Sequence, residues 1–217
     1  MISPEGAHWA DLFDSLGLEY ERSFTGKRQA QIDAVAELMC RLAPGARVLD
    51  VGCASGRPTT EQLCAGGMDV TGMDVSPVML EHARRQVPQA RFVLADLFVF
   101  DDIEALDALG VHDAAVCLFC LVNLPGPRFV DGLRRLAALT RPGGTLLVAV
   151  PEIQGTEEVR FIERTYRPAR CLSEDLHRYA RQAGLEVERV ETRTEPAPDG
   201  QAEPGTILFL WARNPES

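Results

Sequence analysis

The sequence has no long apolar segment. Its longest uninterrupted apolar run, residues 114–122, is nine residues long, whereas a membrane-spanning helix needs about 20. The first five residues, Met-Ile-Ser-Pro-Glu, also lack the basic start and the apolar stretch of a secretory signal. We therefore expect a soluble, cytoplasmic protein that has no membrane partner.

Basic residues are scarce, and only one of them, Lys27, is a lysine. Acidic residues outnumber basic residues by 32 to 22, which gives a net charge of −10. Because such a field repels phosphate backbones, we expect no nucleic-acid partner. The 217 residues are 46% hydrophobic and 25% charged, which is the balance of a globular chain with one domain, or one domain and an appendage.

The sequence also lacks a complete cysteine motif for zinc. Cys117 and Cys120 form one C-x-x-C pair, but the pair lies in the apolar run and has no second pair to complete a site. We expect no bound metal, and we expect both residues to be buried strand cysteines. In a chain without a secretory signal, all the cysteines are expected to be free and mostly buried; they are Cys40, Cys53, Cys64, Cys117, Cys120 and Cys171.

From residue 46 onward, short apolar runs alternate with segments of helical period. The runs predict strands over 48–51, 70–73, 91–95, 114–119, 145–150, 187–192 and 207–212. The other segments predict helices over 58–65, 77–86, 103–109, 128–139 and 173–183, with Ser76 and Ser173 as N-caps. This alternation predicts an α/β fold with a mostly parallel sheet. Helical segments around 9–16 and 29–42 precede the first strand and are expected to pack outside the alternation, and 195–204 is expected to be an exposed loop.

A glycine-containing turn follows the first predicted strand, in the segment Asp50-Val-Gly-Cys-Ala-Ser-Gly56. Glycines at 52 and 56 allow a tight turn and a close approach of a ligand to the backbone. The nicotinamide and flavin fingerprint requires further glycines at 54 and 57, where this chain has Ala54 and Arg57. The carboxylate of Asp50 also suits a positively charged ligand better than a pyrophosphate. A dinucleotide site is therefore disfavoured.

Three aspartates end three consecutive predicted strands: Asp50, Asp74 and Asp96. In open parallel sheets, ligands bind at the carboxyl ends of the strands. A carboxylate after the second strand can accept hydrogen bonds from both hydroxyls of a ribose. Asp96 can accept a hydrogen bond from an exocyclic amine of adenine. Each residue alone is also consistent with an ordinary cap or an exposed position, but the three together indicate a nucleoside site.

Over residues 46–213 the sequence resembles the class I S-adenosylmethionine-dependent methyltransferases, especially bacterial enzymes that act on small molecules. Three blocks carry the resemblance: Val48-Leu-Asp-Val-Gly-Cys-Ala-Ser-Gly56, Val70-Thr-Gly-Met-Asp-Val-Ser-Pro77 and Leu139-Thr-Arg-Pro-Gly-Gly-Thr-Leu-Leu147. The resemblance implies a three-layer sandwich with a seven-stranded, mostly parallel Rossmann-like sheet whose last strand is antiparallel. It divides the chain into an N-terminal helical lid or substrate segment, residues 1–45, and a cofactor-binding domain, residues 46–217.

The resemblance implies an enzyme that binds S-adenosylmethionine and releases S-adenosylhomocysteine. The glycine loop and Asp50 are expected at the methionine end, Asp74 at the ribose, Asp96 at the adenine, and Cys117 with Leu118 beside the methyl group. The expected contacts are Tyr20, Asp50, Gly52, Cys53, Ala54, Gly56, Asp74, Val75, Asp96, Leu97, Cys117 and Leu118. Ala54 departs from the family, which usually has glycine there; alanine disfavours a positive φ.

The implied reaction is an in-line displacement on the sulfonium methyl group by a small organic acceptor, such as a secondary metabolite or an intermediate. Alignment and exclusion of water are its main requirements, and a base is needed only when the acceptor must lose a proton. His8, Tyr20 and Asn123 are candidates for a catalytic role, but each also has a structural interpretation, and no base is assigned. The protein is expected to be a monomer or a homodimer.

Two other functions are consistent with parts of the sequence. A non-catalytic protein that keeps cofactor binding as a regulatory or partner module is the main alternative, because no base is evident and Ala54 replaces glycine. A nicotinamide-dependent reductase is the second alternative, which the glycine spacing disfavours.

Overall fold

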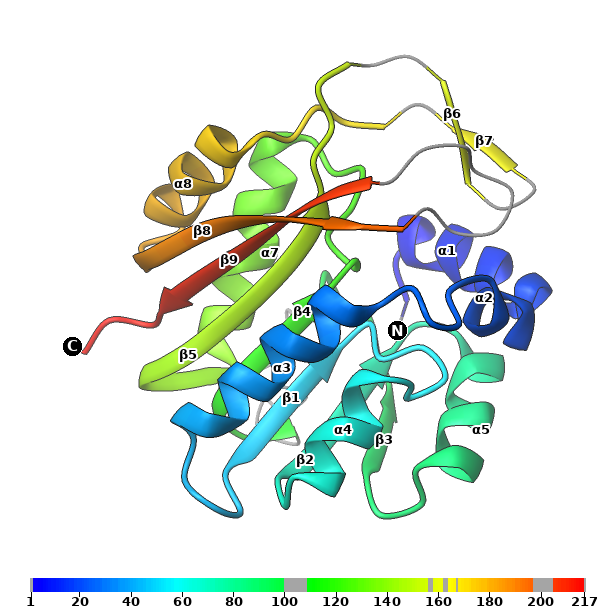
Figure 1. Ribbon diagram of the computed structural model, residues 1–217, viewed down its shortest axis with the longest axis horizontal. Helices are drawn as coiled ribbons and strands as arrows, with labels where there is room; N and C mark the ends of the chain where they lie inside the picture. Colours follow the sequence, from blue (N-terminus) through cyan, green and yellow to red (C-terminus); the bar gives the residue numbers. More distant parts are fainter. Residues whose placement is uncertain are drawn as a thin grey trace.

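The computed structural model describes residues 2–99, 109–155, 158–161, 164–166, 168–196 and 205–216. Its centre is a seven-stranded sheet with the strand order β3-β2-β1-β4-β5-β9-β8 (Figure 1). The strands are β1 (Arg47–Val51), β2 (Asp69–Asp74), β3 (Arg91–Leu94), β4 (His112–Leu118), β5 (Thr140–Pro151), β8 (Glu186–Glu195) and β9 (Gly205–Arg213). Strands β1 to β5 pair in parallel, and β9 is antiparallel to both β5 and β8. The predicted sheet, including its antiparallel last strand, is confirmed.

Helices cover both faces of the sheet and complete a three-layer sandwich (Figure 1). On one face, α3 (Gln29–Arg41) and α4 (Thr59–Ala65) pack through residues such as Leu38 against the sheet residue Val116. On the other face, α7 (Gly126–Ala138) and α8 (Ser173–Gln182) pack through Leu133 and Leu176 against residues such as Cys117. Because β4 is buried on both faces, its inner residues are almost all apolar, as parallel strands require.

The helix starts show which local signals decide the boundaries. Helix α5 (Pro77–Gln86), which lies against β2 and β3, begins as predicted: the Ser76 hydroxyl accepts a hydrogen bond from the Met79 N–H at 3.0 Å. The prediction that Ser173 caps α8 is wrong, because Leu172 occupies the N-cap position and its N–H donates to the Asp175 carboxylate at 2.9 Å. The start of α8 is therefore stabilised by the carboxylate of Asp175, in its first turn, and not by the hydroxyl of Ser173.

The N-terminal helices occupy two different environments. Helices α1 (Pro4–Leu16) and α2 (Leu18–Ser23) lie beyond the carboxyl ends of β1 to β3, outside the strand–helix alternation as expected (Figure 1). By contrast, α3 forms part of one layer of the sandwich. Among the described residues, no helix combines the length and the apolar character needed to cross a membrane.

Several expectations need correction or fall outside the described part of the chain. Cys120 is exposed rather than a buried strand residue, because β4 ends at Leu118. Glu195 is buried at the end of β8 rather than in an exposed loop. Residues 103–108 of a predicted helix and residues 197–204 of the predicted loop lie outside the described residues. Helix α2 and the hairpin of β6 (Val159–Phe161) and β7 (Arg164–Tyr166) are not predicted by the sequence patterns.

Candidate functional site

The three aspartates lie at the carboxyl ends of neighbouring strands and are all buried. Asp50 lies near the end of β1, Asp74 ends β2, and Asp96 follows β3; their exposed fractions are 2%, 9% and 4%. Residues of β2 pair with both β1 and β3, so the three strand ends share one edge of the sheet. Three carboxylates in so little solvent mark this edge as a site for polar or cationic groups.

Asp50 has one protein hydrogen bond among the described contacts. The Thr60 hydroxyl, at the start of α4, donates to its Oδ2 at 2.6 Å. Burial raises the pKa of Asp50 to about 7, with a further contribution from the Asp74 carboxylate and against the effect of the Thr60 hydrogen bond. The buried carboxyl group is therefore poised between its neutral and charged forms near neutral pH, and a cation placed beside it favours the charged form.

The glycine-containing turn is held against β2 by its own backbone. The N–H groups of Gly52 and Cys53 both donate to the Met73 carbonyl, at 2.8 and 3.1 Å. Gly52 and Gly56 have φ of +74° and +82°, and Ala54 also has a positive φ, +47°. Ala54 thus adopts the left-handed conformation that alanine disfavours. The carboxylate of Asp74 stabilises this conformation, because it accepts a hydrogen bond from the Ala54 N–H.

Asp74 connects two loops of the site. Its Oδ2 accepts a hydrogen bond from the Ala54 N–H, and its Oδ1 accepts one from the Ser76 N–H, both at 2.9 Å. Burial raises its pKa, although the backbone donors oppose the shift. Since each carboxylate oxygen has two acceptor sites, both oxygens retain capacity for a ligand hydroxyl.

Asp96 contacts the N-terminal segment, and no local pattern in the sequence predicts this contact. The backbone N–H and the hydroxyl of Ser3 both donate to its Oδ2, at 3.0 and 2.5 Å, and the Phe98 N–H donates to its Oδ1 at 2.8 Å. A Cβ on Gly6 would lie 2.3 Å from the same Oδ2, so only glycine fits there. Ser3 is also the N-cap of α1. Asp96 therefore anchors the first helix over the end of β3.

Two more acidic residues tie this N-terminal segment to the sheet edge. Asp14 accepts hydrogen bonds from the Ser76 hydroxyl and, at 3.3 Å, from the Val78 N–H. Glu21 accepts from the Ser55 hydroxyl at 2.6 Å and from the Gln86 side chain at 3.0 Å. Residues 3–23 thus make polar contacts with the loops that follow β1, β2 and β3. The segment covers the strand ends that carry the aspartates.

Tyr20 lies in this covering segment, between Phe13 and Phe24, with ring centroids 5.1 and 5.2 Å away. The guanidinium group of Arg28 lies over the rings of Tyr20 and Phe24, and its Nη1 donates to the Arg57 carbonyl at 3.2 Å. Its Nη2 is buried without a protein partner among the described residues. Sequence reasoning missed Arg28, since no local motif distinguishes it from other arginines.

The end of β4 continues the same edge of the sheet beside Asp50, because β4 pairs in parallel with β1. Cys117 is fully buried and Leu118 is nearly so, as expected. The chain then turns sharply, and Phe119 and Asn123 both have positive φ, +63° and +60°. The turn places Cys120 against the glycine loop, because a Cβ on Gly52 would lie only 2.6 Å from the Cys120 Cβ.

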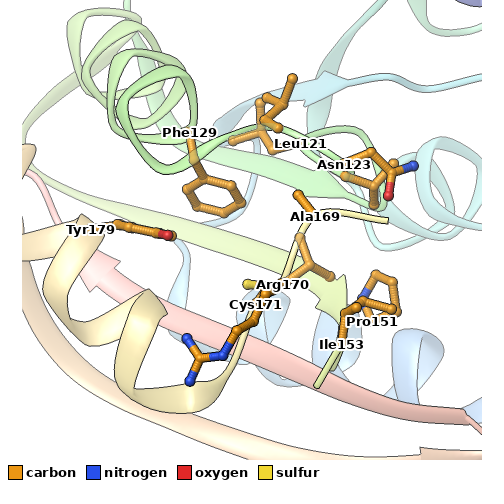
Figure 2. Close-up of a pocket in the computed structure, with 12 residues that line it drawn as sticks. Leu121, Asn123, Phe129, Pro151, Ile153, Ala169, Arg170, Cys171 and Tyr179 are labelled. Atoms are coloured by element: carbon orange, nitrogen blue, oxygen red, sulfur yellow. The ribbon is translucent and has the colours of Figure 1, made fainter. Parts of the chain in front are cut away.

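A pocket begins next to this turn (Figure 2). It is narrow, because the centre of a water-sized sphere can occupy only about 10 Å³ of it, which is room for about one water molecule. Figure 2 shows Phe129 and Tyr179 at one end and Asn123 with Pro151 at the other. The Arg170 charge is balanced by ion pairs with Glu174 at 3.1 Å and Asp175 at 2.8 Å. The lining is otherwise mostly apolar: Leu121, Val122, Leu124, Phe129, Val150, Pro151, Ile153, Ala169 and Cys171.

The remaining candidates occupy less distinctive places. His8 is exposed on α1, where its ring meets Trp9 edge-on at 5.7 Å. Asn123 lines the pocket, at the positive φ that suits an asparagine in a turn. Val75 and Leu97 follow Asp74 and Asp96, and Leu97 is buried. Among the described residues, no group of three His, Cys, Asp or Glu side chains is arranged to hold a metal ion.

Residues 48–144 match a family described as a methyltransferase domain. The chain is 36% identical over 108 residues to a ubiquinone biosynthesis O-methyltransferase of Xanthomonas campestris pv. campestris, covering 49% of this chain and 43% of that protein. It is 30% identical over 203 residues to a 27-O-demethylrifamycin SV methyltransferase of Amycolatopsis mediterranei, covering 84% and 72%. The chain thus spans less than half the length of the first of these relatives.

Solved structures share the fold. A magnesium protoporphyrin IX methyltransferase from Synechocystis with bound S-adenosylmethionine matches with a TM-score of 0.70 at 20% identity, over 97% of this chain and 98% of that one. A 1,6-didemethyltoxoflavin N1-methyltransferase from Burkholderia thailandensis, with bound S-adenosylhomocysteine, matches with a TM-score of 0.71 at 24% identity, over 100% and 92%.

Proposed function

Because this chain belongs to the class I S-adenosylmethionine-dependent methyltransferases, we propose that it transfers the methyl group of S-adenosylmethionine to a small organic acceptor. The observation that carries the proposal is the edge where buried Asp50 and Asp74 flank a turn with left-handed residues at three alternate positions, 52, 54 and 56. Such an edge combines close backbone approach with acceptors for a cation and for hydroxyl groups.

The charge of the donor molecule fits the residues on both sides of the turn. S-adenosylmethionine carries a sulfonium and an ammonium group, and either one beside Asp50 favours its ionised form. Its carboxylate needs a cation. The Nη2 of Arg28, which is buried and has no partner among the described residues, supplies one near the glycine-containing turn, where the Nη1 of Arg28 donates to the Arg57 carbonyl. We assign Asp50, Gly52, Cys53, Ala54, Gly56 and Arg28 to the methionine end.

The nucleoside end follows the next two strands. We assign Asp74 and Val75 to the ribose and Asp96 and Leu97 to the adenine. The free acceptor capacity of Asp74 supports its role. Asp96 already accepts two hydrogen bonds from Ser3 and one from Phe98, so an adenine amine has to share this carboxylate with the first helix. Closure of residues 3–23 and occupation of the nucleoside site are therefore coupled through Asp96.

When bound, S-adenosylmethionine supplies an electrophilic methyl group and leaves as the neutral thioether. The protein has to align an acceptor atom opposite the sulfur and exclude water. Cys117 and Leu118 are assigned to the wall beside the methyl group, and Tyr20 and its aromatic neighbours to the cover. The N-terminal contacts of Asp14 and Glu21 support closure by this cover. His8, Tyr20 and Asn123 remain candidates for a catalytic role.

We assign the residues that line the pocket of Figure 2 to the binding of a small, largely apolar acceptor, for which the pocket has to widen. It begins at Leu121, directly after Cys120, which packs on Gly52. Its one strong cation, Arg170, is balanced by two carboxylates, which leaves little net charge to attract an anion. Phe129 and Tyr179 offer ring faces, and Asn123 offers polar groups for orientation. We also propose that the protein is cytoplasmic, that it has no nucleic-acid partner, and that it is a monomer or a homodimer.

The proposal is tested in two steps. S-adenosylhomocysteine at 100 times its Kd should add about 2.7 kcal/mol of stability and raise the Tm, whereas reduced nicotinamide dinucleotide should not. The protein should then transfer a labelled methyl group to members of a panel of phenols, enols, heterocyclic amines and carboxylic acids. Tight cofactor binding without transfer to any acceptor favours a non-catalytic binding module. A Tm shift with the nicotinamide alone overturns the proposal.

A further inference from the structure

Helix α3 begins with an arginine at a position that ordinarily holds a hydrogen-bond acceptor. Arg28 is the N-cap residue of this helix, and its side chain makes no cap hydrogen bond. An N-cap side chain usually accepts a hydrogen bond from the second or third N–H group of its helix, so serine, threonine, aspartate and asparagine are preferred there. In α3 these N–H groups belong to Ala30 and Gln31. A guanidinium group has no acceptor, so Arg28 cannot cap its own helix.

Glu195 supplies the missing acceptor from a strand far along the chain. It is the last residue of β8, 165 positions after Ala30, and its carboxylate accepts a hydrogen bond from the Ala30 N–H. Glu195 is only 4% exposed. Burial raises the pKa of its carboxyl group, while the N–H donors at the start of α3 and the charge of Arg28 oppose this shift. Glu195 thus occupies the role of an N-cap side chain, and its charge also suits the positive end of the helix dipole.

Because Glu195 caps the helix, the arginine side chain can serve another purpose. The Arg28 guanidinium lies over the rings of Tyr20 and Phe24, 5.1 and 4.5 Å from their centroids, and its Nη1 donates to the Arg57 carbonyl at 3.2 Å. Its Nη2 is buried and has no partner among the described residues. This Nη2 is the group assigned above to the carboxylate of the cofactor. Its position depends on the backbone at the start of α3, which the Glu195 carboxylate contacts.

A second contact connects the same helix start with the candidate site. The side-chain amide of Gln31 donates to the Thr59 hydroxyl at 2.7 Å, and both residues are buried. The next residue, Thr60, donates to the Asp50 carboxylate at 2.6 Å. The first turn of α3 therefore contacts the first turn of α4, which in turn contacts Asp50. A displacement of this turn moves Arg28 relative to the residues assigned to the methionine end.

We propose that Glu195 is a positioning residue for cofactor binding: by capping α3 from β8, it holds Arg28 where its Nη2 meets the carboxylate of S-adenosylmethionine. This role rests on the proposed function, in which Arg28 binds that carboxylate. Glu195 does not itself contact the cofactor in this role. It acts through the backbone of the first turn of α3, so its removal should affect only ligands that carry the carboxylate.

Two ligands separate this role from a general structural effect. S-adenosylhomocysteine carries the amino-acid part, whereas 5′-methylthioadenosine has the same nucleoside and a thioether sulfur but no carboxylate. Calorimetric titration of the full chain gives both affinities. Glu195→Ala should weaken S-adenosylhomocysteine binding about tenfold, as the loss of one N-cap contact can, and leave 5′-methylthioadenosine binding unchanged. Glu195→Gln keeps an acceptor oxygen at the same place and should stay within about threefold of the wild type for both ligands. Equal losses for the two ligands, or no loss in Glu195→Ala, overturn the proposal.

A double-mutant cycle tests whether Glu195 acts through Arg28. Arg28→Ala alone should weaken S-adenosylhomocysteine binding and spare 5′-methylthioadenosine. Adding Glu195→Ala to this variant should cause no further loss, because the residue through which Glu195 acts is absent; a full further loss overturns the proposal. Glu186→Ala removes an exposed carboxylate from the other end of β8 and serves as the charge control, which should bind both ligands like the wild type.

Further outcomes separate this role from the proposed function. If Glu195→Ala does not fold, Glu195→Asp takes its place: it keeps the charge but shortens the side chain by one methylene, and it should weaken S-adenosylhomocysteine binding selectively. A wild-type protein that binds neither ligand overturns the proposed function, and the role of Glu195 with it. Binding that falls in Arg28→Ala but not in the Glu195 variants overturns the role of Glu195 alone.

Discussion

Replacement of Asp50 with asparagine tests whether its carboxyl group is as buried as the structure indicates. Asparagine has nearly the same shape and can still accept the Thr60 hydrogen bond, but it does not titrate. Burial, helped by Asp74, raises the pKa of Asp50 from 3.8 to about 7. The folded state therefore holds this proton more tightly than the unfolded state does, so stability is lost as the pH rises through the folded pKa.

The magnitude follows from the size of the shift. About 3 pKa units correspond to about 4 kcal/mol, since each unit is worth about 1.4 kcal/mol. The stabilising contribution of the proton is complete below about pH 4 and is lost by about pH 7. We expect the free energy of unfolding of Asp50→Asn, minus that of the wild type, to increase by about 1.4 kcal/mol per pH unit between pH 5 and 7 and to be constant above that range.

The assay is urea-induced unfolding of both proteins in the absence of cofactor, at half-unit steps from pH 5 to 8. Titrating groups far from Asp50 contribute equally to the two proteins and cancel in the difference, whereas the contribution of Asp74, which interacts with Asp50, does not cancel completely. Asp11→Asn, which changes an exposed carboxylate of α1, serves as the control and should show no such trend. A difference between Asp50→Asn and the wild type that does not change with pH refutes the burial argument.

Three further predictions concern the same edge of the sheet. Asp74→Ala should weaken S-adenosylhomocysteine binding, measured by calorimetry, by about 1–3 kcal/mol through lost hydrogen bonds; unchanged affinity contradicts the ribose assignment. Ser3→Ala removes both the N-cap of α1 and the hydroxyl bonded to Asp96. It should cost about 0.5–2 kcal/mol and speed amide exchange in α1, and unchanged exchange contradicts the anchoring role. Ala54→Gly relieves a left-handed alanine and should raise the free energy of unfolding by up to about 1 kcal/mol; a loss contradicts the strain.

The order of strands and helices follows from local patterns in the sequence. The β4 segment is apolar on both faces, which only an inner strand of a covered sheet requires, and the Ser76–Pro77 pair starts α5 where it was predicted. The spacing of Gly52 and Gly56 after β1 likewise identified the turn. These features depend on residues close together in the chain.

Two predicted boundaries, at the end of β4 and at Glu195, were wrong because residues far away in the chain decide them. Cys120 continues the apolar run in sequence, but β4 stops two residues earlier, because the chain turns at Phe119 toward Gly52. The polar appearance of Glu195 suggested a loop, yet its carboxylate is buried and accepts a hydrogen bond from the Ala30 N–H at the start of α3. In both cases the partner is a residue far away in the chain.

The sequence by itself determined the fold, the family resemblance and the positions of the three aspartates, because each rests on periodicity or on short spacings. Only the tertiary structure decided the pKa values and the hydrogen-bond partners of these aspartates. The pKa of Asp50 depends on how much water the folded chain excludes, and the contact between Ser3 and Asp96 joins residues 93 positions apart. Desolvation and long-range contacts arise from packing, so they are properties of the assembled molecule rather than of any segment of its sequence.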